Sequence, residues 1–527
     1  MPASAAVTDY YDIIVIGTGP GGASLAGRLA TTGRRILLIE RGGYLARSVD
    51  NWDPQRVFVD GIYRTAELWQ DQHGKSFRPE LHHFVGGNSK VYGAALFRLR
   101  ERDFDEVVHS GGISPAWPLG YSDYSRYYDE AERLYHVHGQ RGEDPFEPTA
   151  EGPYPHPPVR HEAQIAQLSQ ALNDRGLRPY HIPLGILLDE DEHGARPDSP
   201  CIRCSRFDGF PCPTNGKADA QVVGVDPLLK RHPDTVRLLT GANVERLETG
   251  SEGRRVECVH VTRAGAQETY GAGIVVVAGG ALSSALLLLR SADDRHPNGL
   301  ANGSGLVGRH YMRHNLSVLM GLLCEQNSSV FQKTMAVSDY YFSAPDWDYP
   351  LGLVQMMARA YGAQIRGQVL PSFLSHLPDW PFEKFAAHAL DFWVQSEDLP
   401  DPDNRIFYDG GRVVLSLTPN NMEAHERLIA RWKQDLSEAD VLTRLPGGVH
   451  LYFTQGIGIA GTAHQVGTCC FGNDPRSSVL DTNCRAHELD NLYVADGSFF
   501  PSIGAVNPTL TIVANALRVA DRIKERL

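Results

Sequence analysis

The sequence has few cysteines and no long hydrophobic run, and both scarcities narrow the class of protein. Eight cysteines in 527 residues are too few for a small secreted scaffold built on disulfides. The longest apolar stretch, Ile274 to Leu289, is too short for a membrane span and is interrupted by glycines and serines. Residues 1–8 carry neither a basic region nor an apolar run, so we expect no signal peptide. We therefore expect a cytoplasmic protein that does not associate with membranes.

Positively charged residues are also fewer than negatively charged ones. The chain has 50 Lys and Arg against 63 Asp and Glu, a formal net charge of −13. An acidic surface disfavours phosphate backbones, so we do not expect a nucleic-acid partner. Apolar residues make up 42% of the chain, which supports large buried cores, and the length allows two or three domains.

Three of the cysteines lie close together, Cys201, Cys204 and Cys212, with the spacing C-x2-C-x7-C. A structural zinc usually takes four ligands, and no fourth ligand follows nearby. We therefore predict no metal site. Reduced cysteines in a turn containing glycine and proline are the favoured interpretation, and a local disulfide or a zinc site remain alternatives.

What the sequence does contain is a dinucleotide-binding pattern near its start. An apolar stretch over residues 11–16 leads into Gly17-x-Gly19-x-x-Gly22, and Glu40 follows about 20 residues further on. Gly17 permits a tight turn, Gly19 allows the backbone to approach a pyrophosphate, and Gly22 allows the following helix to pack closely. Glu40 ends the next predicted strand, where its carboxylate can accept hydrogen bonds from ribose hydroxyls. A second glycine pattern at residues 303–308 follows a loop and is not expected to bind a nucleotide.

Further elements are expected along the chain. Strands are predicted over residues 236–239, 244–247, 254–263, 267–270, 273–278, 316–320, 351–357 and 491–497, and helices from the small-residue turn at 279–280 through Leu289 and from Asn507 to Arg526. Asn507 is expected to cap the last helix and Pro508 to occupy its first position.

Four motifs, in this order, resemble those of the glucose–methanol–choline (GMC) oxidoreductase family. They are the N-terminal glycine pattern, residues 85–93, the turn at 277–281, and the C-terminal segments around His464 and Asn507. The resemblance implies an α/β protein with a Rossmann-like FAD-binding domain and an interleaved α+β substrate-binding domain on an antiparallel sheet. The expected FAD-binding segments are 1–105, 215–312 and 445–527, and the expected substrate-binding segments are 106–214 and 313–444.

The resemblance also implies roles for individual residues. His464 falls on the active-site histidine and Asn507 on its partner position. The family's FAD-linking histidine would fall at Val91, which has no nucleophile, so we expect non-covalent FAD. Residues expected to contact the cofactor are Gly17, Gly19, Gly22, Glu40, Arg41, Gly87, Asn88, Val244, Ala278, Asp496, Gly497, Pro508 and Thr509.

Alcohol oxidation needs a group that takes the hydroxyl proton, and a histidine suits this role because its pKa lies near neutrality. We expect His464 to be that base and Asn507 to donate a hydrogen bond to the same substrate oxygen. The remaining histidines near these motifs, His82, His83, His310 and His314, are expected to have no catalytic role.

Residues 85–100 and 395–400 resemble the branch of the family that holds pyranose oxidases and bacterial glycoside oxidases. Gln355 and Gln395 provide neutral amides suited to sugar hydroxyls. We expect oxidation of a secondary ring hydroxyl of a sugar or glycoside, at carbon 2 or carbon 3, to a ketone, with electrons passed to dioxygen. A sugar dehydrogenase that uses a quinone, and a non-redox member similar to a hydroxynitrile lyase, remain alternatives.

Overall fold

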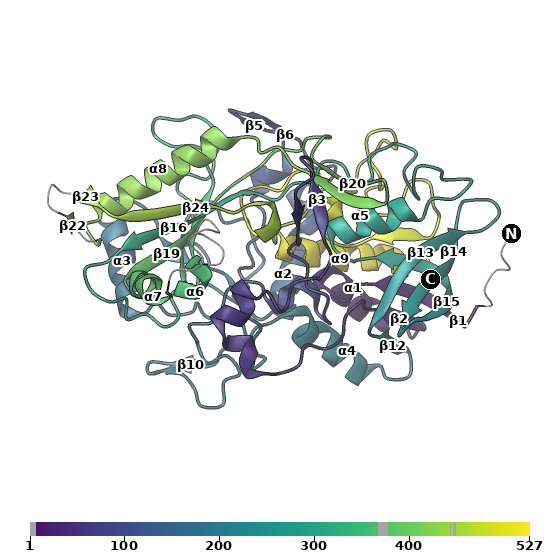
Figure 1. Ribbon diagram of the computed structural model, residues 1–527, viewed down its shortest axis with the longest axis horizontal. Coiled ribbons are helices and arrows are strands. Elements are labelled where there is room, and N and C mark those ends of the chain that lie inside the picture. Colours follow the sequence, from purple (N-terminus) through teal and green to yellow (C-terminus); the bar gives the residue numbers. More distant parts are fainter. Residues whose placement is uncertain (1–6, 367–377, 443, 446–448) are drawn as a thin grey trace.

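The computed structural model describes residues 7–366, 378–442, 444–445 and 449–527. A seven-stranded sheet lies in one half of the molecule together with both ends of the chain (Figure 1). Its order is β12-β2-β1-β15-β14-β13, with β25 also paired to β15. The strands are β1 (Asp9–Ile16), β2 (Ile36–Ile39), β12 (Val236–Leu239), β13 (Ala242–Thr249), β14 (Val256–Arg263), β15 (Ala266–Val277) and β25 (Leu492–Val494).

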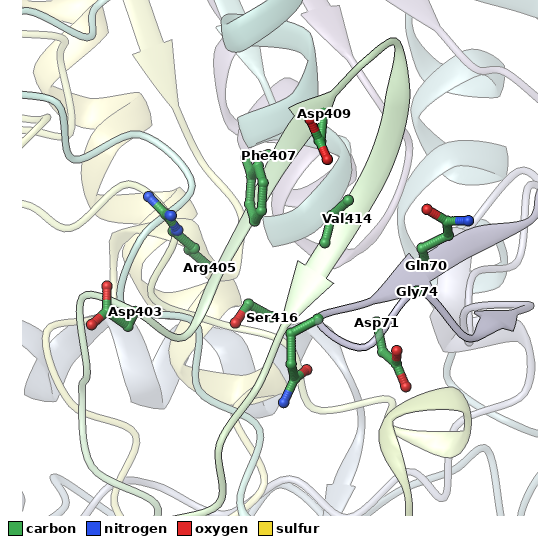
Figure 2. Close-up of a pocket in the computed structure, with 10 residues that line it drawn as sticks. Gln70, Asp71, Gly74, Asp403, Arg405, Phe407, Asp409, Val414 and Ser416 are labelled. Atoms are coloured by element: carbon green, nitrogen blue, oxygen red, sulfur yellow. The ribbon is translucent and has the colours of Figure 1, made fainter.

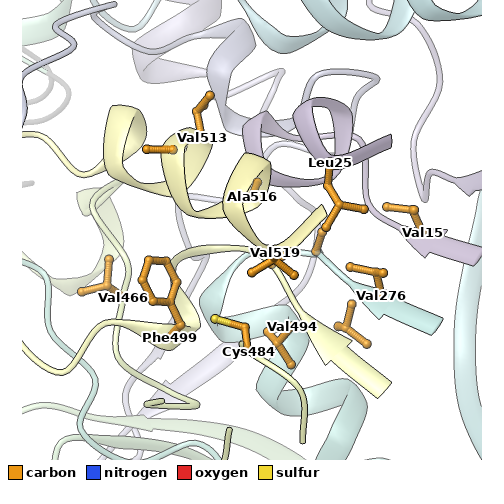
Figure 3. Packing of buried hydrophobic residues seen from close by; sticks show 14 of the residues in the cluster. Val15, Leu25, Val276, Val466, Cys484, Val494, Phe499, Val513, Ala516 and Val519 are labelled. Carbon is orange, nitrogen blue, oxygen red and sulfur yellow. The ribbon is translucent and has the colours of Figure 1, made fainter. Parts of the chain in front are cut away.

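In the parallel part of this sheet, β2, β25 and the second halves of β1 and β15 are continuous apolar runs because helices and other chain segments cover them, whereas the edge strand β12 carries the exposed Arg237. All four residues of β2 are buried. Helices α1 (Pro20–Ala30) and α9 (Thr509–Lys524) pack against each other, and α5 (Ala281–Arg290) packs near β13. Leu25 of α1 and Val519 of α9 belong to the same core as the strand residues Val15, Val276 and Val494 (Figure 3).

A second, six-stranded sheet occupies the other half of the molecule (Figure 1). Every pairing in it is antiparallel, in the order β24-β16-β19-β18-β17-β8. One face packs on helices α3 (Ala163–Asn173) and α8 (Met422–Glu438). The strands are β8 (Tyr180–His181), β16 (Asn315–Leu322), β17 (Met335–Val337), β18 (Leu353–Met356), β19 (Ala389–Ser396) and β24 (Tyr452–Gly456).

Alternation along two strands of this sheet places polar side chains on the face away from α3 and α8. Val354 and Met356 of β18 belong to the core formed with those helices, so Gln355 between them faces the opposite way. Gln395 of β19 alternates with Val394 of the same core in the same manner. The fold is therefore a Rossmann-like sheet and an antiparallel sheet, with two buried glutamines on the face of the latter that is opposite α3 and α8.

The structure differs from the sequence-based expectations at three places. Residues 267–270 and 273–277 form one strand, β15, because its first half pairs with β14 and its second half with β1 and β25. The prediction that Asn507 caps the last helix is wrong, since α9 begins at Thr509 and Pro508 is its N-cap. The edge strand β24 lies within the range expected to bind FAD, yet it pairs with β16 of the antiparallel sheet.

A small third sheet was not anticipated. It joins the hairpin β20 (Arg405–Asp409) and β21 (Arg412–Ser416) to β3 (Trp69–Asp71) and β4 (Ser76–Phe77). Helix α2 (Tyr121–Leu134) packs on α9. In the part of the chain that the structure describes, no helix is both long and apolar enough to cross a membrane.

Candidate functional site

A cavity of about 740 Å³ is lined both by turns at the ends of the parallel strands and by residues of the antiparallel sheet on the face opposite α3 and α8. Of the site residues expected from the sequence, all but Gly22 line this cavity. Those that line it are Gly17, Gly19, Glu40, Arg41, Gly87, Asn88, Val244, Ala278, Gln355, Gln395, His464, Asp496, Gly497, Asn507, Pro508 and Thr509. The fold thus brings segments from both ends and the middle of the chain to one place.

The glycines of the first turn serve two different needs. Gly17 has a φ of +103°, and a Cβ added to it would lie 2.2 Å from the backbone oxygen of Ala278. A Cβ on Gly22 would lie 2.1 Å from the backbone oxygen of Gly17, so this residue permits close packing behind the turn. Gly19 is different, because a Cβ there would meet nothing within 4 Å. The backbone at Gly19 therefore borders open space that a ligand can fill.

Glu40 is buried at the end of β2 and is tied to this turn. One carboxylate oxygen accepts hydrogen bonds from the backbone nitrogen and the hydroxyl of Thr18, at 3.1 and 2.6 Å. The other accepts one from the backbone nitrogen of Gly42 at 3.0 Å. Burial raises the pKa of Glu40. The Thr18 hydroxyl also accepts a hydrogen bond from the backbone nitrogen of Gly86 at 3.1 Å, which anchors the loop containing Gly87 over the turn.

Asp496 links the second βα turn to the C-terminal segment. Its carboxylate accepts hydrogen bonds from the backbone nitrogens of Gly280 and Ser498, both at 2.9 Å, and from the hydroxyls of Ser284 and Ser498. Burial raises its pKa. This carboxylate fixes the small-residue turn after β15 against Gly497, so that both border the same cavity.

These residues fit an extended dinucleotide such as FAD. The start of α1 borders the cavity, and its first backbone N–H groups have no partner within the helix, which suits a diphosphate. Glu40 suits ribose hydroxyls. The start of α9 also borders the cavity and contributes positive potential near His464 and Asn507. Val91, which occupies the position of the family's FAD-linking histidine, also lines this cavity.

His464 and Asn507 are neighbours at the end of the cavity nearest the antiparallel sheet. Nε2 of His464 lies 3.2 Å from Nδ2 of Asn507, and Nδ1 of His464 lies 3.0 Å from Nδ1 of His314. Burial, and after it the positive charge of Lys333, lowers the pKa of His464 to about 4. The imidazole is therefore neutral at physiological pH and has the protonation state of a base.

The side-chain amides of Gln355 and Gln395 donate hydrogen bonds to different partners. Gln355 donates a hydrogen bond from Nε2 to Oδ1 of Asn507 at 2.8 Å, and Gln395 donates one from Nε2 to the backbone oxygen of Ala505 at 2.9 Å. Their Oε1 atoms are buried and have no hydrogen-bond partner among the described residues. The Oδ1 atom of Asp208, which also lines the cavity, has none either. The three residues line the cavity, while these three acceptor atoms have almost no accessible surface of their own.

Three residues of this site were missed from the sequence. His314 contacts His464, while Lys333 and Asp208 form an ion pair at 3.0 Å that borders the cavity. His314, for which the sequence predicts no catalytic role, lies directly against His464. Nothing in the local sequence separates it from the other histidines, of which the chain has 21 in total.

The three-cysteine turn, Cys201, Cys204 and Cys212, holds Asp208 in place. All three thiols are free. The buried amino group of Lys217 donates hydrogen bonds to the backbone oxygens of Tyr92, Phe207 and Phe210, at 2.8 to 3.0 Å, and so braces the turn. Among the residues that the structure describes, no group of three or more His, Cys, Asp or Glu could hold a metal ion.

A second hollow, of about 400 Å³, lies beside the third sheet (Figure 2). Side chains of β3 and of the β20–β21 hairpin surround it, among them Gln70, Arg405 and Asp409. Within the described part of the chain, its lining includes none of the expected site residues. The expected site residues, apart from Gly22, line the larger cavity instead.

The fold and this cavity define an oxidoreductase of the dinucleotide-binding α/β class. The chain belongs to the GMC oxidoreductase family, since matches to that family cover residues 37–316 and 414–516. Members of this family typically use FAD, and this chain is an oxidoreductase that acts on alcohol groups.

Two curated relatives and one solved structure illustrate the similarity. The chain is 32% identical to paromamine 6'-oxidase of Streptomyces fradiae, over 97% of this chain and 91% of that protein. It is 30% identical to 2-methyl-1,2-propanediol dehydrogenase of Mycolicibacterium austroafricanum, over 98% and 96%. The structure of pyridoxine 4-oxidase from Mesorbium loti matches with a TM-score of 0.67 and 19% identity, covering 98% of this chain and 99% of that one, which shows the shared fold.

Proposed function

We propose that this chain is an FAD-dependent enzyme that oxidises a hydroxyl group of a sugar or glycoside and passes the electrons to dioxygen. The observation that carries the proposal is the pair His464 and Asn507 in the same cavity as the dinucleotide turn. A base and a hydrogen-bond donor thus lie beside the place where the cofactor residues converge.

The chain's own residues supply the acid–base chemistry, and bound FAD supplies the hydride acceptor. Neutral His464 takes the proton of the substrate hydroxyl at Nε2. When substrate is bound, Nδ2 of Asn507 donates to the same substrate oxygen instead of to Nε2 of His464, which fixes the orientation of that oxygen and leaves the lone pair of Nε2 free for the proton. Both side chains are partly buried, which reduces their contact with water and strengthens these interactions relative to those in solution.

The polar lining of the cavity supports a polyhydroxylated substrate. Gln355, Gln395 and Asp208 line it, and a few polar side chains in such a cavity suit the hydroxyl or amino groups of a sugar. Trp393 lines the same cavity and offers an aromatic surface to the apolar face of a sugar ring. The similarity to a paromamine oxidase, named for an aminoglycoside substrate, supports this class.

The position of oxidation is part of the proposal. The sequence favours a secondary ring hydroxyl at carbon 2 or carbon 3, by resemblance to pyranose and glycoside oxidases. The name of the paromamine relative points to a 6' position instead. Identification of the product by NMR distinguishes a ring ketone from an aldehyde at the exocyclic carbon.

We further propose that FAD is bound without a covalent link, because Val91 stands where the linking histidine would be. A dehydrogenase that uses a quinone-type acceptor is the second candidate. The similarity to 2-methyl-1,2-propanediol dehydrogenase favours it.

The test is an anaerobic screen in which flavin absorbance is followed after addition of glucosides, aminoglycosides, 1,2-diols and choline, followed by admission of dioxygen or a quinone. Bleaching by glycosides and fast return with dioxygen would support the proposal. Fast return with quinone alone would establish the dehydrogenase. If no alcohol bleaches the flavin, the protein does not carry out this oxidation and a non-redox role of the lyase type is favoured.

A further inference from the structure

His314 occupies an unusual position behind the active-site pair. Its side chain is fully buried, and its backbone has a φ of +67°, which is uncommon for a residue other than glycine. A carboxylate oxygen of Asp398 accepts a hydrogen bond from its backbone nitrogen at 2.9 Å, which helps to hold this conformation. Such conformations persist only where the surroundings fix them, and they concentrate at functional sites.

Five groups form an unbroken series of hydrogen bonds through this point. Gln355 contacts Asn507 at 2.8 Å, Asn507 contacts His464 at 3.2 Å, and His464 contacts His314 at 3.0 Å. The series ends where Nε2 of His314 lies 3.1 Å from the backbone oxygen of Gly504. Each link needs one donor and one acceptor, so the direction of any one link sets the direction of the others.

The carbonyl of Gly504 decides that direction, because a carbonyl oxygen can only accept. Nε2 of His314 must therefore carry a hydrogen. Burial, and after it the neighbouring His464, holds the pKa of His314 well below its usual value, so the ring is neutral and its Nδ1 is an acceptor. It follows that Nδ1 of His464 carries a hydrogen and donates it to His314.

The other end of the series agrees with this assignment. With its proton on Nδ1, His464 has a lone pair on Nε2, which accepts a hydrogen bond from Nδ2 of Asn507. The Oδ1 atom of Asn507 then faces the N–H of Gln355, as the structure has it. In the reversed arrangement, the unprotonated Nε2 of His314 would face the lone pairs of the Gly504 oxygen. Only one direction gives every donor an acceptor.

We propose that His314 is a positioning residue that fixes His464 in the tautomer with the proton on Nδ1, so that Nε2 is the base that faces the substrate. Gln355 assists by fixing the amide of Asn507. This inference rests on the proposed function, in which His464 takes the hydroxyl proton. When substrate binds, its hydroxyl replaces the N–H of Asn507 at the lone pair of Nε2, and Asn507 donates to the substrate oxygen instead. The substrate O–H bond then breaks, the Nε2–H bond of His464 forms, and the resulting imidazolium keeps donating from Nδ1 to neutral His314.

The tautomer can be measured without turnover. NMR of the FAD-loaded enzyme with ¹⁵N-labelled histidine, at neutral pH and without substrate, should show a protonated Nδ1 and an unprotonated Nε2 for His464. The resonances are assigned by their loss in His464→Gln. A proton on Nε2 in the wild-type enzyme would overturn the inference. Because no substrate is present, this result stands apart from the outcome of the substrate screen.

Kinetics of flavin reduction provide the second test. His314→Leu removes the acceptor and should lower the reduction rate constant about 10²- to 10⁴-fold, the range for a misplaced acid–base group, with substrate Kd and FAD content nearly unchanged. His314→Asn places Oδ1 near the former Nδ1 and should restore much of the rate. His425→Asn is the matched control, since His425 is also buried but bonds Ser317 and Ser396.

A wild-type rate in His314→Leu, or an equal loss in His314→Asn and His314→Leu, would overturn the positioning role. A failure of every alcohol to reduce the wild-type flavin would instead overturn the proposed function, while the tautomer measurement would still decide the state of His464.

Discussion

Flavin reduction is expected to persist at acidic pH, because the base is held neutral. His464 has a pKa of about 4, lowered from 6.5 by burial and then by Lys333. At about pH 5.5 a group with this pKa is about 97% neutral, whereas an unperturbed imidazole would be about 9% neutral, a difference of about tenfold in active base. The reduction rate should therefore stay flat down to about pH 5.5 and fall only below it.

The assay is anaerobic stopped-flow measurement of the flavin reduction rate constant at saturating substrate across this pH range. Lys333→Gln removes a positive charge near the imidazole, so the pKa of His464 should rise and the acid limb should move to higher pH. Lys384→Gln, on exposed α7 (Trp380–Ala387), is the control and should leave the limb in place. An acid limb near the unperturbed imidazole pKa in the wild-type enzyme would refute the reasoning.

Three further predictions follow from the cofactor site and the three-cysteine turn. Gly19→Ala should weaken FAD affinity at least tenfold (~1.4 kcal/mol) with little change in apoprotein Tm, because the added methyl group would protrude into the cavity. The control is Gly27→Ala on α1, where an added methyl group also meets open space, and this variant should retain full FAD occupancy. Acid precipitation should release the FAD into the supernatant, because Val91 offers no nucleophile; yellow colour in the pellet would contradict this. Incubation with a strong zinc chelator should leave Tm and activity unchanged, whereas one tightly held zinc per chain that activity requires would show that the three-cysteine turn is a metal site.

Local patterns account for most of what the sequence predicted correctly. The glycine turn after β1 is encoded within a few residues, because the positive φ of Gly17 and the approach of Gly22 to the backbone of Gly17 are both set inside the turn. Period-two alternation in β18 places Gln355 opposite the core, which a strand prediction already implies. The start of α9 differs by only one or two residues from the expectation, the usual uncertainty at a helix end.

The missing parts of the site depend on contacts that are distant in sequence. His314 reaches His464 across 150 positions, and Lys333 reaches Asp208 across 125. Neither hydrophobic periodicity nor the spacing of motifs in the sequence indicates which distant residues are in contact. For the same reason, the sequence did not indicate that β24 belongs to the antiparallel sheet, because its pairing with β16 is a contact between distant segments.

The measurement that tests the central claim most directly is the rate of flavin reduction in His464→Ala with the best substrate from the screen. We expect a loss of about 10²- to 10⁴-fold with FAD content unchanged, because the cavity keeps its cofactor residues and loses only the base. A variant that reduces its flavin at a near-normal rate would contradict the account, since His464 would then have no part in removing the hydroxyl proton.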